Sequence, residues 1–317
     1  MRPADSVPAI AVVVPTHNRA DLLPRALRSV LAQGFRDFEL LVVDDASEDA
    51  TPKVLAGIAD PRLRSLRHSR GAGAAVARNT GIRNATAPLI AFLDDDDELL
   101  PGFLDTMVQA FGAALPDVGF GWCGLQWVFS GAAEPGPVRE ETWAPSFANR
   151  EAAYRSFLRS RRIGSSGLTV RAGSIDEIGG FDEHLAKAED TDLLIRLARH
   201  FDFLVAPQVL MRIHLHDGPH LRTYDRRAAD AYRVILRKNA DTLAEDPALS
   251  ATLHYKLAWL SYHSGDRRAG RDALLTALRG RPWFLKGWLA LPLFEILGVR
   301  ALAIHRRCSQ ALRRLRR

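Results

Sequence analysis

Four consecutive carboxylates, Asp94, Asp95, Asp96 and Asp97, directly follow the apolar run at residues 90–93. Along an extended backbone alternate side chains share a face, so Asp94 and Asp96 are expected to point the same way. Like charges held this close raise each other's pKa, and a bound divalent cation removes that penalty. Hard cations such as Mg²⁺ take carboxylate oxygens and bridge them to substrate phosphates. The run therefore predicts a divalent-cation site, with a solvated acidic turn as the alternative.

The elements that would position these acids alternate between strands and helices. Short apolar runs predict strands, and helical spacing between them, as in the alanine-rich residues 74–85, predicts crossover helices. This order implies an α/β fold with a mostly parallel mixed sheet flanked by helices. In such sheets ligands bind beyond the carboxyl ends of the strands, so one site could collect the polar clusters found there. The predicted strands of this half are residues 9–14, 38–43, 63–66 and 89–93.

After residue 102 the pattern becomes mixed. We expect strands at residues 120–129, 168–171 and 203–205, a helix at 191–200, and a surface loop at 130–145, which is rich in Gly, Pro and Glu. From about Tyr224 the helical pattern takes over. The sequence thus predicts two domains, 1–224 and a helical appendage at 225–317.

Two common nucleotide-binding folds are disfavoured, because the glycines that they need are missing. A dinucleotide-binding fold needs G-x-G-x-x-G after its first strand, but the first turn here is Pro15-Thr16-His17-Asn18-Arg19. The phosphate-cradling G-x-x-x-x-G-K-[ST] is also absent. Dehydrogenase and nucleotide-hydrolase functions are therefore disfavoured.

Six motifs occur in order over about residues 9–214. They are Val14-Pro15-Thr16-His17-Asn18-Arg19, Val43-Asp44-Asp45-Ala46-Ser47, Ala77-Arg78-Asn79-Thr80-Gly81, Phe92-Leu93-Asp94-Asp95-Asp96-Asp97, Gly179-Gly180-Phe181-Asp182-Glu183 with Ala188-Glu189-Asp190-Thr191-Asp192, and Arg212-Ile213-His214. In their order and spacing these motifs resemble family 2 glycosyltransferases. The resemblance implies a glycosyltransferase A fold, a nucleoside-diphosphate sugar donor, Mg²⁺ or Mn²⁺, and inversion of the anomeric centre.

The resemblance assigns a donor side to the site. It implies that Asp96, Asp94 and His214 hold the metal, although a lone histidine is more often a core or surface residue, and His216 and His220 compete for this role. Asp45 could instead form an Asx turn, and Arg78 could be a solvated helix residue. The residues implied to bind the nucleotide are Pro15, Thr16, Asn18, Arg19, Asp44, Asp45, Arg78, Asp94 and Asp95.

The acceptor side follows from the chemistry of inversion, which needs a general base to deprotonate the attacking hydroxyl. The resemblance places that base at Asp190, and it places Glu189, Gly164 and Ser165 near the acceptor. The alternative is that the acids at 189, 190 and 192 only complement a helix N-terminus. Aromatic faces can stack on sugars, but tryptophans are as often core residues, so Trp122, Trp127 and Trp143 stay open.

Composition limits the compartment and the partners. The chain carries a net charge of +6, and only five of its 43 basic residues are lysine, which favours anionic partners. Two cysteines argue against a disulfide framework or a cysteine-ligated zinc site. The N-terminus shows no signal peptide, so a cytoplasmic protein is expected.

The C-terminal charge is separate from the predicted site. Residues 283–304 are mostly apolar, and six arginines without an acid follow by residue 317. This suits a helix lying on anionic lipid at the inner face of the plasma membrane, and equally a core helix with a solvated basic tail. A nucleic-acid partner is not expected, because the aromatics lie apart from the arginines. Residues 253–265 and 266–280 predict a helical hairpin that caps a neighbour.

The sequence therefore predicts an inverting glycosyltransferase that uses a nucleoside-diphosphate sugar and acts on a glycan or lipid-linked acceptor. A nucleotidyltransferase acting on sugar phosphates is one alternative, although the first turn lacks the glycine-rich, basic sequence it needs. A non-catalytic glycan-assembly scaffold is another. It would predict the loss of Asp94, Asp96 or Asp190, and all three are present.

Overall fold

The computed structural model describes residues 7–129, 139–143, 146–159, 164–215 and 225–297. The chain divides into two compact units, which are described separately. The first holds residues 1–185 and 189–219, and the second holds residues 186–188 and 220–317. Tyr224, where the sequence predicts the domain boundary, lies outside the described residues.

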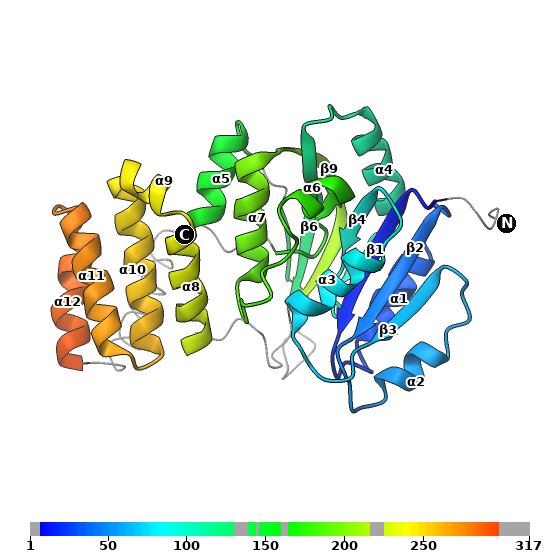
Figure 1. The fold of residues 1–317 in the computed structure, drawn as a ribbon, viewed down its shortest axis with the longest axis horizontal. Coiled ribbons are helices and arrows are strands. Elements are labelled where there is room, and N and C mark those ends of the chain that lie inside the picture. Colours follow the sequence, from blue (N-terminus) through cyan, green and yellow to red (C-terminus); the bar gives the residue numbers. More distant parts are fainter. Residues whose placement is uncertain (1–6, 130–138, 144–145, 160–163, 216–224, 298–317) are drawn as a thin grey trace. The chain divides into compact units, whose positions relative to one another are not determined.

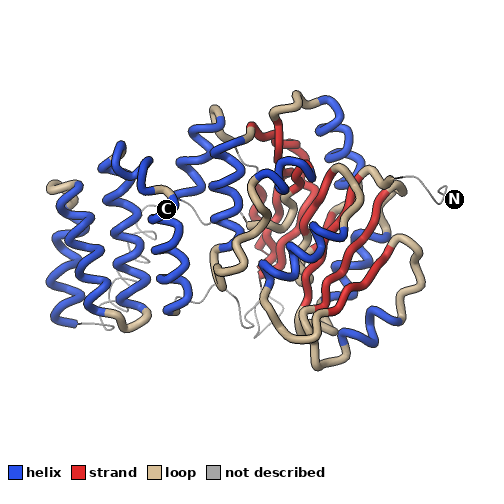
Figure 2. Tube along the Cα trace, in the orientation of Figure 1, coloured by secondary structure: helices blue, strands red, loops and turns tan. Residues whose placement is uncertain are grey.

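The described part of the first unit is built on a nine-stranded sheet (Figures 1 and 2). Its strands lie in the order β3-β2-β1-β4-β8-β6-β9-β5, and β7 pairs with β6. The first four strands are mutually parallel, as are β6 and β9, and the other neighbours are antiparallel. This mixed sheet confirms the predicted α/β class. The strands are β1 (Ile10–Thr16), β2 (Phe38–Asp44), β3 (Leu63–Arg67), β4 (Leu89–Phe92), β5 (Glu98–Leu99), β6 (Val118–Phe129), β7 (Arg139–Trp143), β8 (Thr169–Arg171) and β9 (Asp202–Leu215).

Strand register brings the polar clusters to one edge. Thr16 at the end of β1 lies opposite Asp44 at the end of β2. On the other side of β1, Leu93 N donates to Val13 O at 3.1 Å just after β4 ends. Because parallel strands in register end at the same edge, the loops after β1, β2 and β4 begin side by side.

Helices cover the sheet and complete the core. Ile10, Val12 and Val14 of β1 belong to an apolar cluster that includes Leu23 and Leu27 of α1. Val13 points to the opposite face, where α3 packs. The helices of this unit are α1 (Leu23–Leu31), α2 (Thr51–Ala56), α3 (Ala74–Asn84), α4 (Phe103–Ala113), α5 (Arg150–Arg159), α6 (Ala172–Glu177) and α7 (Glu189–His200).

Two strands differ from the sequence prediction. The predicted loop at 130–145 is wrong at residues 139–143, because these residues form β7 against β6. The strand predicted at 203–205 continues to Leu215 in β9, beyond Pro207. The register of β6 with β9 shifts next to Gly124, and this irregularity lets the ladder resume after the proline. β9 therefore returns Arg212 and His214 to the vicinity of β5.

The second unit is a stack of helices, and its α10 and α11 pack on each other as a hairpin. Asp225, Asp246 and Asp266 each cap a helix by accepting a backbone N–H with the side chain. None of the described helices is both long enough and apolar enough to cross a bilayer. The helices are α8 (Arg226–Lys238), α9 (Ala240–Glu245), α10 (Pro247–His263), α11 (Arg267–Gly280) and α12 (Leu285–Leu297).

Replacing Gly81 by alanine tests the contact between α3 and β1. An added Cβ would lie 2.3 Å from Val13 Cγ1 in a fully buried strand, so either α3 or β1 must shift. We expect Gly81→Ala to lower the free energy of unfolding by about 1–3 kcal/mol in urea titrations. Gly112→Ala in α4 is the matched control, because nothing lies within 4 Å of its added Cβ. It should be neutral or stabilise by up to about 1 kcal/mol. Equal effects of the two substitutions would contradict this packing.

Candidate active site

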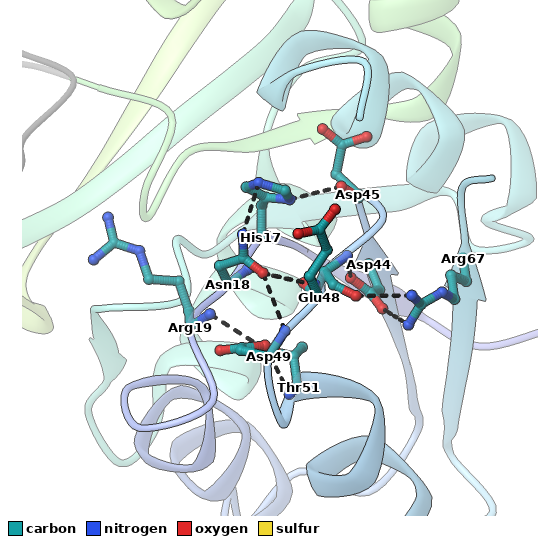
Figure 3. A network of polar contacts seen from close by, with 10 residues as sticks. His17, Asn18, Arg19, Asp44, Asp45, Glu48, Asp49, Thr51 and Arg67 are labelled. Carbon is teal, nitrogen blue, oxygen red and sulfur yellow. Dashed lines mark hydrogen bonds and ion pairs between the residues drawn. The ribbon is translucent and has the colours of Figure 1, made fainter. Parts of the chain in front are cut away.

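The loops after β1 and β2 are tied together by a polar network (Figure 3). Asn18 N donates to Ser47 Oγ at 2.9 Å, and Asn18 Oδ1 accepts from Glu48 N at 2.8 Å. His17 Nδ1 donates to Asp45 O at 2.7 Å. Asn18 also adopts a positive φ of 53°, a backbone conformation that asparagine tolerates better than most residues. The side chain of Asn18 therefore shapes the loop that surrounds the predicted nucleotide site.

Both carboxylates after β2 are held by groups of the chain. Asp44 accepts from Ser47 N at 2.9 Å and from Arg67 Nη1 at 2.8 Å. Asp45 accepts from His68 Nδ1 at 2.7 Å and from the backbone N–H groups of residues 72 and 73. Burial alone would raise the pKa of Asp45, but these hydrogen bonds lower it below its ordinary value. Local sequence patterns did not identify Arg67 and His68, because both contacts span more than twenty residues.

The acid run after β4 alternates in exposure. Asp95 and Asp97 are buried, whereas Asp94 and Asp96 are partly exposed. The backbone is not extended here as predicted, because Asp97 N donates to Asp94 O at 3.1 Å and closes a turn. Burial raises the pKa of Asp95 to about 7, and the charges of Asp96 and Asp94 add to this effect against the opposing influence of Thr16 and Arg19. Burial, Asp94 and Asp96 also raise the pKa of Asp97 well above its ordinary value. Burial and the neighbouring charges thus both disfavour the ionised form of the two buried acids.

Arg78 of α3 connects this run to α7. Its Nη2 donates to Asp94 Oδ1 at 2.7 Å and its Nη1 to Glu189 Oε1 at 3.0 Å. The side chain is only 5% exposed, and its guanidinium also lies over the ring of Phe181. Burial opposes its charge, but Asp94 and Glu189 raise the pKa of Arg78 above its ordinary value. Arg78 is therefore an internal cation between the two acids, which excludes the solvated-helix alternative.

Asn79, the next residue of α3, fixes the Gly-Gly-Phe-Asp-Glu motif. Its Nδ2 donates to Phe181 O and its Oδ1 accepts from Phe181 N, both at 2.9 Å. Gly180 has a φ of 69°, and a Cβ there would lie 2.6 Å from Asn79 Oδ1. The motif therefore needs glycine at this position, so that its backbone can approach α3.

Asp190 lies in the first turn of α7, and α7 begins at Glu189, two residues before the predicted start. Its Oδ1 accepts from Thr191 N at 2.6 Å. Burial, followed by the charge of Glu189, raises the pKa of Asp190 to about 6. A Cβ on Gly164 would lie 3.3 Å from Asp190 Oδ2, so the predicted acceptor segment does border the predicted base.

The segment after Gly164 also reaches the acid run. Ser165 is 2% exposed and its carbonyl accepts from Leu168 N at 3.0 Å. The neighbouring Ser166 accepts from Asp94 N through its hydroxyl at 3.1 Å. Residues 164–168 therefore border both Asp94 and Asp190.

His214 reaches the acid run from β9. Its backbone N donates to Asp97 Oδ1 at 3.0 Å, and its Nε2 donates to Glu98 Oε2 at 2.7 Å. Within the described residues, no group of three or more His, Cys, Asp or Glu side chains is arranged to hold a metal ion. His216 and His220 lie outside the described residues.

The remaining predicted residues are placed as follows. Pro15 and Thr16 are buried at the end of β1, and Arg19 is half-buried close to Asp95. Trp122 is fully buried against Phe120 and Phe157, so it is a core residue. Trp127 is half-buried, and the side chain of Trp143 is not described.

Comparisons with known proteins identify the family of the chain. A family model described as glycosyl transferase family 2 matches residues 11–126. GalNAc(5)-diNAcBac-PP-undecaprenol beta-1,3-glucosyltransferase of Campylobacter jejuni is 30% identical over 263 residues, which cover 81% of each chain. Succinoglycan biosynthesis protein ExoO of Rhizobium meliloti is 44% identical, but the match covers 35% of this chain and 32% of that protein.

Two solved structures share the fold. S. aureus TarS 1-349 in complex with UDP-GlcNAc has a TM-score of 0.62 and 20% identity, over 93% of this chain and 87% of that one. Mannosyltransferase PcManGT from Pyrobaculum calidifontis, in complex with GDP-Man and Mn²⁺, has a TM-score of 0.56 and 20% identity, over 90% and 81% of the two chains. With a relative matched over four fifths of its length and the motifs gathered at one edge of a shared fold, the chain belongs to glycosyltransferase family 2.

Proposed function

We propose that this protein transfers a sugar, with inversion, from a nucleoside-diphosphate sugar to a hydroxyl of a lipid-linked saccharide or glycan. The observation that carries the proposal is the link through Arg78 between Asp94, on the donor side, and Glu189 beside Asp190, on the acceptor side. The Campylobacter relative is named for a lipid-linked acceptor, and the S. aureus structure holds UDP-GlcNAc. The first name supports a lipid-linked acceptor for this protein, and the second supports a nucleoside-diphosphate sugar donor.

The donor is proposed to lie over the loops after β1, β2 and β4. Pro15, Thr16, Asn18, Asp44 and Asp45 would surround the nucleoside, since they form or hold these loops. Arg19 is the proposed phosphate contact, because its guanidinium is half-buried beside the acid run. Arg78 would contribute indirectly, because its hydrogen bond orients Asp94.

Asp94 and Asp96 are the proposed ligands of a divalent cation. They are the more exposed pair of the run, and their charges raise the pKa of the buried Asp95 and Asp97. When bound, Mg²⁺ or Mn²⁺ would offset the charge of the diphosphate leaving group. His214 would join them only if its Nε2 left Glu98 or if Nδ1 were used. The structure that contains GDP-Man and Mn²⁺ supports a metal of this kind.

Asp190 is proposed as the general base. Its Oδ1 is bonded to Thr191 N, and its Oδ2 borders Gly164, where the absence of a side chain leaves room for an acceptor hydroxyl. The hydroxyl oxygen attacks the anomeric carbon from the face opposite the diphosphate, whose bond to that carbon breaks, and the proton passes to Asp190. A pKa of about 6 keeps this carboxylate ionised at neutral pH and more basic than an ordinary aspartate.

Cytoplasmic location with peripheral attachment to the inner face of the plasma membrane suits a lipid-linked acceptor. The described helices contain no membrane span, so contact with such an acceptor would occur at the membrane surface. This location is part of the proposal.

Nucleotide binding is the first test. In the presence of Mn²⁺, one of UDP, GDP, dTDP or CMP should raise the melting temperature above that with Mn²⁺ alone. A ligand at one hundred times its dissociation constant adds about 2.7 kcal/mol of stability, which thermal-shift assays detect. No shift with any of the four nucleotides would count against a nucleoside-diphosphate sugar donor.

Replacing the base separates catalysis from binding. Asp190→Asn should lower transfer by a factor of about 10²–10⁴ and leave the nucleotide-induced thermal shift in place. In the wild type, kcat/KM should rise as pH increases through about 6, because only the ionised carboxylate accepts the proton. Asp176→Asn, at an exposed carboxylate of α6, is the control and should keep full activity. Retained transfer by Asp190→Asn would remove Asp190 as the base.

The internal cation can be tested against a surface cation on the same helix. Arg78→Met leaves Asp94 and Glu189 without their counter-charge, and it should lower the free energy of unfolding by about 3–5 kcal/mol. Arg83→Met removes an exposed ion pair with Glu183 and should cost less than about 1 kcal/mol. Urea titration of both variants measures the difference, and similar midpoints would show that Arg78 is not the internal link.

A further inference from the structure

Helix α12 exposes an apolar stripe, which we define as Trp283, Leu285, Trp288, Leu289 and Ile296. Trp283, just before the helix, is 91% exposed, and Ile296 near its end is 78% exposed. At 3.6 residues per turn the four helical members fall within an arc of about 100°. The other exposed large apolar residues of the described chain are Val7, Leu115 and Val209, each in a different segment. A contiguous apolar surface of this kind marks an interaction site.

The opposite face of α12 already accounts for its packing in the second unit. Phe294 is 1% exposed and stacks on Tyr262 of α10, with ring centroids 4.4 Å apart. The ring of Trp259 meets Phe294 edge-on at 5.6 Å. The stripe is therefore a second apolar face, against which no described helix of this unit packs.

Two polar side chains near the stripe, those of Trp288 and Glu295, already form hydrogen bonds within the chain. Trp288 Nε1 donates to Pro282 O at 2.7 Å, so its indole can enter an apolar layer without losing a water partner. Glu295 is the single acid in the sequence after Asp272. It turns to the packed side, where Arg271 and the hydroxyl of Tyr262 hold it. No acidic side chain from α12 therefore opposes an anionic surface.

Charge favours such a surface over a second copy of the chain. Residues 220–317 contain 20 Arg and Lys against eight Asp and Glu, a net charge of +12, so the rest of the chain carries −6 of the total +6. Lys286 is exposed on α12 itself, and residues 298–317, outside the described part, contribute seven of the arginines. Stripe-to-stripe pairing of two copies would bring two +12 regions together, whereas anionic lipid attracts this charge.

We propose that the α12 stripe docks on an anionic lipid bilayer. The indoles of Trp283 and Trp288 lie at the level of the headgroups, and Leu285, Leu289 and Ile296 enter the edge of the acyl layer. The exposed Lys286 faces the lipid phosphates. The proposal deepens the peripheral location proposed above and rests on it, but it does not involve the chemistry of transfer.

Sedimentation of the full-length protein with vesicles tests the docking. Wild type should bind vesicles made of equal parts phosphatidylglycerol and phosphatidylcholine, and should bind pure phosphatidylcholine much more weakly. Joint replacement Trp288→Ser and Leu289→Ser should lower the partition coefficient at least about tenfold, because it removes much of the inserted apolar surface. Leu115→Ser, at an exposed leucine of the first unit, is the matched control and should bind like wild type.

A second variant keeps the stripe intact. Lys286→Glu should weaken binding to the phosphatidylglycerol vesicles, because it places a negative charge beside the stripe. Circular dichroism checks that both variants fold. Wild-type binding by the double variant would overturn the proposal, as would equal binding to both lipids. Light scattering that shows a wild-type dimer and a monomeric double variant would also overturn it, with a second copy as the occupant.

The vesicles contain neither nucleotide nor glycan, so the result is independent of the transfer reaction. Asp190→Asn should bind them like wild type. Loss of docking with nucleotide binding retained would refute the membrane surface alone, and loss of nucleotide binding with docking retained would refute the proposed donor alone.

Discussion

The burial of the Arg78 guanidinium is the constraint on which the site depends. Removing a cation from water costs several kcal/mol, about as much as a whole domain can spare, unless carboxylates accompany it. Asp94 follows β4 and Glu189 begins α7, so the ion pairs join segments that are far apart in the chain. Asn79 anchors Phe181 from the same helix through neutral hydrogen bonds. Helix α3 thereby fixes both halves of the site to the sheet.

The carboxylates of this edge fall into two groups with different environments. Asp45 accepts several N–H groups, and its pKa lies below the ordinary value. Asp95, Asp97 and Asp190 lie in buried, negatively charged surroundings, and the pKa of each is raised. Environments that separate otherwise identical groups in this way assign them different chemical tasks. Here the hydrogen bonds of Asp45 hold a loop in place, whereas the raised pKa of Asp190 suits the general base proposed above.

The acidic side chains at this edge of the sheet could be predicted from the sequence, because the patterns that indicate them are local. Apolar runs that end in acids indicate strand ends, and parallel strands bring such ends together. The contacts that define each acid could not be predicted in this way. His68 reaches Asp45, and Glu98 reaches His214 across 116 residues, so neither pairing leaves a periodic pattern. Strand β9 was predicted too short for a related reason, since the irregularity opposite Pro207 depends on the register of β6.

The network of Asn18 with residues 47–49 has a consequence for how a ligand meets the protein. Asn18 and Ala46 both hold a positive φ, a conformation that free loops seldom adopt and that these hydrogen bonds maintain. A ligand at the proposed donor site would therefore meet loops already held in their positive-φ conformation, and would spend little affinity on selecting a rare conformer. Discrimination between ligands at this edge would then rest on fit to these loops rather than on the free energy of closing one.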